Sequence, residues 1–213
     1  MRIDASVSPA ALRAGMLADL GARHIDNRFH YVGERSAAMW QALADSHSPA
    51  LAEDGLAAYE RAARAALALL PDGPVHVIGM ACGDGAKERR LLGALASAGR
   101  TDITATAMDV SVPLVSAAAA AMGAVPGVGT TDAVAVDITA VRDLSPLVAS
   151  GTPGTRLVTV FGIISTLGPD VLVPATSLLR PGDVLMASAN LLPDRPGARE
   201  AIMAQYDNPP TRA

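Results

Sequence analysis

The chain has 213 residues, of which half are apolar and 18% are charged, and its formal net charge is −4. This length predicts one domain, or one and a half, with a large core. The acidic balance without a basic run argues against a nucleic-acid partner. The single cysteine, Cys82, excludes an internal disulfide and is typical of a reducing cytoplasm.

No targeting or membrane segment is expected. The N-terminus, MRIDASVSPAALRAGM, lacks a basic start followed by a continuous apolar stretch. The most apolar window, residues 112–129, is interrupted by Pro113, Ser116 and Pro126, whereas a membrane span needs about 18 apolar residues. We therefore predict a soluble, cytoplasmic protein without membrane partners.

Residues 1–72 are predicted to form an N-terminal helical region. The stretch SPAALRAGMLADLGAR offers Ser8 as an N-cap and Pro9 in the first turn. GERSAAMWQALAD and EDGLAAYERAARAALALL carry apolar residues at helical spacing. The breaker PDGP at 71–74 then separates this region from residues 73–213.

Strands and helices alternate after this break. VHVIGM is a short apolar run typical of a buried parallel strand, and ITATAM, AVAV, TRLVTVFG and DVLMASAN follow it as further strands. Helices are predicted after the first four strands, in AKERRLLGALASAG, VPLVSAAAAAMG, AVRDLSPLVAS and PDVLVPATSLL. The alternation predicts an α/β fold with a doubly wound, Rossmann-like parallel sheet over 73–213.

The loop ACGDGAK after the first strand is the first candidate for a ligand site. Gly83 and Gly85 permit close approach of the backbone to a ligand, and the next helix N-terminus favours polar or anionic groups. The same glycines also suit a plain strand-to-helix turn. The loop alone therefore leaves both interpretations open.

Two aspartates support a nucleoside site. Asp109 ends the second strand, where a carboxylate can accept hydrogen bonds from both ribose hydroxyls, and Asp137 ends the third, where it can bind an adenine amino group. Either aspartate could also cap the helix that follows it. Together with the loop they form the pattern of class I S-adenosylmethionine (SAM) methyltransferases, whereas GDG lacks the full G-x-G-x-x-G of a dinucleotide site.

The stretches ACGDGAKERRLLGAL and TAMDVSVPLV resemble the histidine-specific SAM-dependent methyltransferases. RFHYVGERSAAMW, YERAARAAL, TRLVTVFGIISTLGP, RPGDVLMASANLLPD and AQYDN agree in order and spacing, so the resemblance covers the chain from about residue 25 onward. It implies a class I methyltransferase fold with a SAM pocket and an amine substrate.

The resemblance also implies roles for individual residues. The cofactor-binding positions are Cys82, Gly83, Gly85, Lys87, Asp109 and Asp137. The substrate-binding positions are Ile163, Ser165, Asn190 and Trp40, and the catalytic ones are Tyr31 and Tyr206. Trp40 is more often a core residue than a substrate platform, and both tyrosines are equally compatible with a place in the core.

Several positions depart from the family pattern. Gly79 stands where an acid is common, and Ala81 puts a methyl group where the backbone should approach the methionine part of SAM. Thr166 and Leu167 stand where the family has a Gly-Asn pair, and Asn190 stands where it has an aspartate. We therefore expect a SAM pocket whose nucleoside half is retained and whose methionine half is altered. We also expect a substrate other than histidine.

The family closes its sheet with a C-terminal antiparallel hairpin, and only 23 residues follow Asn190. We expect a sheet that lacks this hairpin and is completed by a partner chain, because an open edge and an uncovered apolar face are poorly tolerated. A fragment of a longer protein is the alternative.

Other chemistry has weaker support. His24, His30, His47 and His76 show no ligand spacing, so no metal site is expected, and His76 on a buried strand is interpreted as a hydrogen-bonded core residue. Cys82 lies near a helix N-terminus that would lower its pKa, but no partner base is visible for a nucleophile.

Three functions remain open. The first is a subunit of a two-chain biosynthetic enzyme that orients an amine-bearing secondary metabolite for attack on carbon, preferably by aziridine-type ring closure, with SAM dispensable and Asp109 available as proton acceptor. The second is a conventional SAM-dependent N-methyltransferase for a small-molecule amine. The third is a non-catalytic scaffold subunit. Intact Asp109 and Asp137 favour the second, whereas Ala81, Leu167 and the early end of the chain favour the first.

Overall fold

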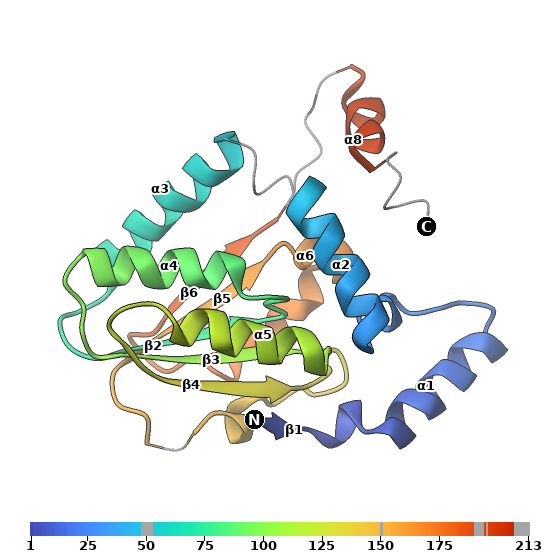
Figure 1. Ribbon diagram of the computed structural model, residues 1–213, viewed down its shortest axis with the longest axis horizontal. Helices are drawn as coiled ribbons and strands as arrows, with labels where there is room; N and C mark the ends of the chain where they lie inside the picture. The colour runs from blue at the N-terminus through green and yellow to red at the C-terminus, as the bar shows by residue number, and fades with distance from the viewer. Residues whose placement is uncertain (48–52, 150, 190–193, 195, 207–213) are drawn as a thin grey trace.

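The computed structural model describes residues 1–47, 53–149, 151–189, 194 and 196–206. Its centre is a parallel sheet of six strands in the order β1-β4-β3-β2-β5-β6 (Figure 1). The strands are β1 Arg2–Ile3, β2 Val75–Met80, β3 Ile103–Asp109, β4 Val128–Ala135, β5 Thr155–Phe161 and β6 Val184–Ser188. This doubly wound α/β architecture confirms the predicted fold class.

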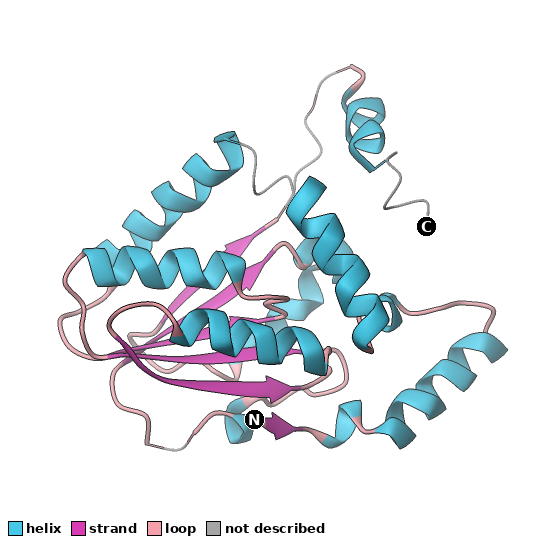
Figure 2. Cartoon of the chain, in the orientation of Figure 1, coloured by secondary structure: helices cyan, strands magenta, loops and turns pink. Residues whose placement is uncertain are grey.

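Helices lie along the faces of the sheet, except the first and the last, which stand apart from it (Figure 2). They are α1 Pro9–Gly21, α2 Glu34–His47, α3 Glu53–Leu69, α4 Ala86–Ser97, α5 Val112–Gly123, α6 Ile164–Leu167, α7 Leu172–Thr176 and α8 Ala198–Tyr206. Short 3-10 turns are η1 Ala5–Val7, η2 Asn27–His30, η4 Ser145–Leu147 and η5 Pro169–Val171. No helix in the described ranges is long and apolar enough to cross a membrane.

The core has two parts, one on each face of the sheet. Side chains alternate between the faces of a strand, so Val75 and Val77 of β2 belong to the cluster beneath α3, α4 and α5. Ile78 and Met80 of the same strand belong to the cluster that includes Ala175 of α7. The unbroken apolar run of β2 therefore reflects burial on both faces.

Local signals predicted most elements correctly. Ser8 caps α1 as predicted, because its hydroxyl accepts the N–H of Ala11 at 3.3 Å. His76 is a buried core residue as predicted, with Nε2 2.8 Å from the Thr106 hydroxyl. Burial lowers the pKa of His76 to about 4, which keeps the ring neutral.

The N-terminal region departs from its prediction at one place. Residues 1–72 are not helical throughout, because Arg2 and Ile3 form β1 and pair with β4 in parallel. The start of the chain therefore belongs to the sheet and extends it by one edge strand.

The helix predicted in AVRDLSPLVAS was also wrong, since residues 140–149, the described part of this stretch, form only η4. The Asp143 carboxylate accepts both the N–H and the hydroxyl of Ser145, at 2.9 and 2.7 Å. Such local side-chain bonds compete with helix formation.

The predicted absence of a C-terminal hairpin stays a prediction, since residues 190–193, 195 and 207–213 lie outside the described part. Within the described part, β6 pairs with β5 alone.

Candidate ligand site at the carboxyl edge of the sheet

The glycine loop, residues 81–85, follows β2 at the carboxyl edge of the sheet, where open α/β sheets bind ligands. Gly83 and Gly85 have φ angles of 57° and 74°, in the left-handed region that favours glycine. A Cβ at Gly83 would lie 2.5 Å from the Trp40 ring, and one at Gly85 would lie 3.0 Å from Cα of Ala118. The absence of a Cβ at these two glycines therefore allows α2 and α5 to pack closely against the loop.

Ala81 departs from the glycine that the family pattern favours, and its φ is 47°. A residue with a Cβ in the left-handed region costs about 1–2 kcal/mol. The chain thus keeps the backbone path of a glycine at this position despite the methyl group.

Asp109 closes the loop from β3. Its Oδ2 accepts the N–H of Gly83 at 2.9 Å, and its Oδ1 accepts the N–H of Ser111 at 2.9 Å. The side chain is buried, and burial raises the pKa of its carboxyl. Both carboxylate oxygens already hold backbone donors, so the aspartate organises the loop in this conformation.

Asp137 follows β4 and is paired within the chain. Its Oδ2 accepts Nη1 of Arg28 at 2.6 Å, and its Oδ1 accepts the N–H and the hydroxyl of Thr139 at 2.9 and 2.6 Å. Arg28 belongs to η2, 109 residues earlier in the chain, and was not predicted from the sequence. The carboxylate predicted to hold an adenine amino group therefore holds a guanidinium.

The side chain of Glu88 explains why residue 79 is glycine. A Cβ at Gly79 would lie 2.8 Å from Cγ of Glu88, on the first turn of α4. Glu88 is only 1% exposed, and its Oε1 accepts the Thr159 hydroxyl at 3.0 Å. Burial raises the pKa of Glu88 to about 7. This carboxyl was not predicted, because nothing local in the sequence marks it as a partner of a strand glycine.

A polar cluster lies beside the loop, at the ends of β5 and β6. Lys87 directs Nζ to the Phe161 carbonyl at 3.5 Å and lies 6.0 Å from the centre of the Tyr59 ring. The Tyr59 hydroxyl is 3.0 Å from Oγ of Ser188, which also accepts the N–H of Gly162 at 3.1 Å. Lys87 was predicted as a site residue, whereas Tyr59 and Ser188 were not.

The predicted substrate-side residues are distributed unevenly. Tyr31 is half-buried, and burial followed by the nearby charge of Asp109 raises the pKa of its hydroxyl. Ile163 is half-buried where α6 begins, and Ser165 is exposed on α6. Asn190 and the side chain of Tyr206 lie outside the described residues.

Cys82 has the electrostatics of an unreactive thiol. Burial, then the nearby carboxyls of Glu88 and Asp109, raise its pKa well above the ordinary value. This direction is opposite to the effect expected from a helix N-terminus. The structure thus gives no support to a cysteine nucleophile.

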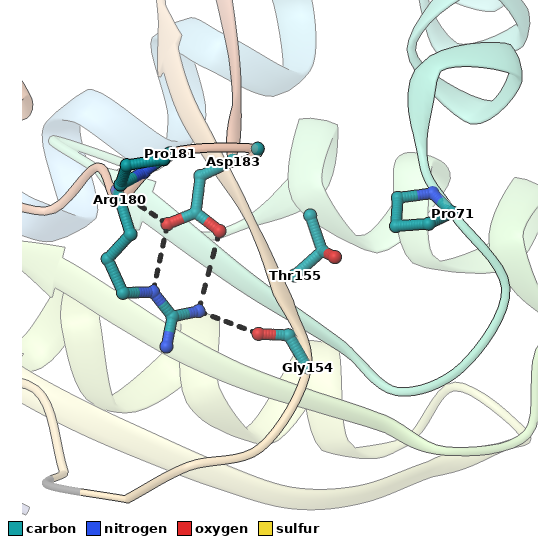
Figure 3. Close-up of a pocket in the computed structure, with 7 residues that line it drawn as sticks. Pro71, Gly154, Thr155, Arg180, Pro181 and Asp183 are labelled. Carbon is teal, nitrogen blue, oxygen red and sulfur yellow. Dashed lines mark hydrogen bonds and ion pairs between the residues drawn. The ribbon is translucent and has the colours of Figure 1, made fainter.

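Two other features bear on the choice of site. Among the described residues, no group of three His, Cys, Asp or Glu could hold a metal ion. A hollow of about 460 Å³ lies at the opposite, amino edge of the sheet, lined by Pro71, Gly154, Thr155, Arg180, Pro181, Gly182 and Asp183 (Figure 3). There Arg180 bonds Asp183 at 3.1 Å and the Gly154 carbonyl at 2.6 Å, so these polar groups satisfy one another.

Comparison with known protein families and with curated proteins finds no match. Among solved structures, two of the plantazolicin methyltransferase BpumL, in complex with desmethylPZN analogs and S-adenosylhomocysteine (SAH), are similar. Their TM-scores are 0.51 and 0.52 at 11% and 10% identity, and each match covers 92% of this chain and 64% of that chain. The chain thus spans less than two thirds of the length of these neighbours. The likeness shows a class I methyltransferase fold.

The residues present do not fit SAM in this conformation. Asp137, the predicted adenine partner, holds Arg28, and Asp109 bonds the loop itself. The Trp40 ring packs directly on Gly83. A nucleoside at this edge would have to displace the side chains of Arg28 and Trp40.

Proposed function

We propose that the chain supplies the methyltransferase-fold site of a biosynthetic enzyme in which an amine nitrogen of a small-molecule substrate attacks carbon. The preferred form of this reaction is intramolecular ring closure of the aziridine type. The observation that carries this choice is the Arg28–Asp137 pair of 2.6 Å, which occupies a nucleoside anchor with the protein's own side chain.

Ring closure needs no methyl donor. The nitrogen forms a bond to a carbon of the same molecule, the bond from that carbon to its leaving group breaks, and the leaving group departs with the electron pair. The nitrogen gives up one proton to a base. The protein contributes a folded, near-attack conformation and a site shielded from water.

On this proposal the substrate lies against Tyr31 and Trp40, while the predicted roles of Asn190 and of the Tyr206 side chain concern groups outside the described part of the chain. Tyr31 is supported by its proximity to the charge of Asp109, and Trp40 by its packing on the glycine loop. On this proposal the chain corresponds to the SAM-fold subunit of a two-chain enzyme like the aziridine-forming pair of azinomycin biosynthesis, an assignment that rests on the family resemblance and the altered glycine loop.

The proposal includes a second protein chain that adds strands beside β6. Within the described part the outer edge of β6 carries no strand, and Leu185 on this strand is 37% exposed. Unpaired strand edges are templates for pairing with another chain.

A SAM-dependent N-methyltransferase is the second candidate. It is favoured by Asp109 at the end of β3, by the glycine loop, and by the fold shared with SAH-bound neighbours. It requires that ligand binding releases Arg28 and Trp40. A non-catalytic scaffold is the third candidate, and turnover by the chain would exclude it.

Calorimetry with SAM and SAH separates the first two candidates. We expect no binding tighter than roughly 1 mM to the wild type, because its anchors are occupied, and none to Arg28→Ala, because the altered loop lacks the methionine half of the pocket. Arg23→Ala, which changes an exposed arginine outside the site, is the control. Micromolar binding that Asp109→Ala abolishes would overturn ring closure in favour of methyl transfer.

A further inference from the structure

Three buried carboxyl groups lie at the carboxyl edge of the sheet, and they differ in what their oxygens hold. Both oxygens of Asp109 accept backbone N–H groups, and both oxygens of Asp137 have partners, one of them a guanidinium. Glu88 uses Oε1 for the Thr159 hydroxyl, while Oε2 is buried and has no partner among the described residues. Oε2 of Glu88 is thus the oxygen among these three carboxyls that has no hydrogen-bond partner in the described residues.

This carboxyl belongs to the layer directly beneath the glycine loop. The position that a Cβ would take at Gly79 is 2.8 Å from Cγ of Glu88 and 3.1 Å from Cβ of Cys82. Cys82 is itself a loop residue, and Thr159 lies beside Gly79 on β5. The carboxyl is therefore enclosed by β2, β5, the start of α4 and the loop.

This enclosure makes a charged Glu88 dependent on a cation. A buried carboxylate is costly unless it is paired. Within the described ranges no ion pair includes Glu88. The adjacent Lys87 directs its ammonium group to the Phe161 carbonyl. The carboxyl must therefore bind either a proton or a cation that comes from outside the described residues.

The charged neighbours of Glu88 do not offset its burial. Burial is the largest influence on the pKa of Glu88 and raises it. The Glu88 backbone N–H, the charge of Lys87 and the Thr159 hydroxyl lower this pKa, and the charge of Asp84 raises it further. The Cys82 thiol, which also faces this carboxyl, is itself held neutral by burial. The protonation of Glu88 is therefore governed mainly by its burial, which the nearby charge of Lys87 does not offset.

Because only one carboxylate is present, it restricts the type of cation that can bind. No cluster of three metal-ligating side chains occurs in the described part of the chain, so a metal ion is a poor match. An ammonium group has several N–H donors and needs only one carboxylate to neutralise it. The left-handed glycines of the loop above allow the close backbone approach that a small ligand needs.

We propose that Glu88 is the amine-binding carboxylate of this site: when the overlying glycine loop opens, Oε2, which is buried in this structure, accepts an N–H of a primary or secondary ammonium group of the substrate. The inference rests on the amine chemistry of the proposed function, and it assigns a residue that binds the substrate amine. It holds for ring closure and for N-methylation alike, so the SAM and SAH measurement does not decide it.

The test uses n-propylammonium as the probe and n-propanol as its uncharged isostere. Trp40 is the single tryptophan and packs on Gly83, so its fluorescence reports on the loop, and calorimetry provides a second readout. We expect saturable, millimolar binding of the amine at about pH 8.5, and no comparable binding of the alcohol. Because the pKa of Glu88 is about 7, binding should weaken about thirtyfold at pH 5.5.

Glu88→Gln removes the charge and keeps the shape, and we expect it to weaken amine binding at least tenfold. Glu60→Gln, which changes an exposed glutamate of α3, should bind as the wild type does. In the wild type itself, the ¹³C signal of the Glu88 carboxyl should show a lower pKa when the amine is added. This measurement does not depend on how the variant folds.

Four results would overturn the proposal. They are a wild type that does not bind the amine, equal binding of amine and alcohol, wild-type affinity in a folded Glu88→Gln, and a Glu88 titration that the amine leaves unchanged. Tight SAH binding alongside Glu88-dependent amine binding would remove ring closure but leave this site in place.

Discussion

Ala81 has a side chain, although its backbone adopts a conformation that favours glycine. Its φ of 47° would suit glycine, and relief of left-handed strain is worth about 1–2 kcal/mol. Glycine also adds about 0.4–1 kcal/mol of conformational entropy to the unfolded chain. We therefore predict that Ala81→Gly raises the free energy of unfolding by up to about 1 kcal/mol, measured by urea denaturation.

Arg23 is a matched control for this effect. It has a φ of 53° directly after the C-cap of α1, where glycine is the usual residue, and its side chain is exposed. Arg23→Gly should stabilise the chain to a similar extent and leave the Trp40 fluorescence unchanged. A clear loss of stability in Ala81→Gly alone would mean that the Ala81 methyl group packs favourably enough to outweigh its strain.

The sequence predicted the positions of those candidate residues that follow from local pattern. Gly83, Asp109 and Asp137 all stand close after short apolar strands or at their ends, and parallel pairing brings such positions to one edge. Their partners could not be found in this way. Arg28 meets Asp137 across 109 residues, and Glu88 is recognised only by the space that it occupies beside a strand glycine.

At the scale of elements, α3 is joined to the sheet through Tyr59. Its ring packs edge-on against Phe161 at 5.3 Å, and its hydroxyl meets Oγ of Ser188 at 3.0 Å. Tyr59→Phe keeps the ring contact and removes the hydrogen bond. We predict a loss of about 1 kcal/mol in the free energy of unfolding, measured in urea, because Ser188 still accepts the N–H of Gly162.

A double-mutant cycle with Ser188→Ala isolates this bond. The two single changes should not add, because either one already removes the Tyr59–Ser188 interaction. Fully additive losses would show that the 3.0 Å contact contributes nothing between α3 and β6.

Elements with strong local signals were predictable, and those set by tertiary pairing were not. The predicted helix VPLVSAAAAAMG matches α5 at both ends, because its alanine-rich composition and a proline in the first turn favour a helix in many contexts. β1 has two residues, too few for a pattern, and exists because it pairs with β4. The third predicted strand begins earlier than AVAV, since β4 pairs with β3 from Val128 onward although several of its first residues are exposed.

At the scale of the whole molecule, two buried groups give opposite dependences of stability on pH. Burial lowers the folded pKa of His76 from 6.5 to about 4, so its contribution is complete above pH 6.5 and is lost as the pH falls towards 4. Burial raises the folded pKa of Glu88 from 4.5 to about 7, so its contribution is complete below pH 4.5 and is lost as the pH rises towards 7.

Between these limits the two contributions oppose each other, each on the order of 3 kcal/mol. We therefore predict that the free energy of unfolding of the wild type is nearly level from about pH 4.5 to 6.5 in urea titrations. Glu88→Gln removes the contribution of Glu88 and leaves that of His76. The free energy of unfolding of this variant should therefore rise by roughly 3 kcal/mol as the pH increases from about 4.5 to 6.5, whereas Glu60→Gln should follow the wild type. If the pH profiles of Glu88→Gln and the wild type are parallel, Glu88 titrates as an ordinary glutamate. The proposed need of this carboxylate for an ammonium partner would then be contradicted.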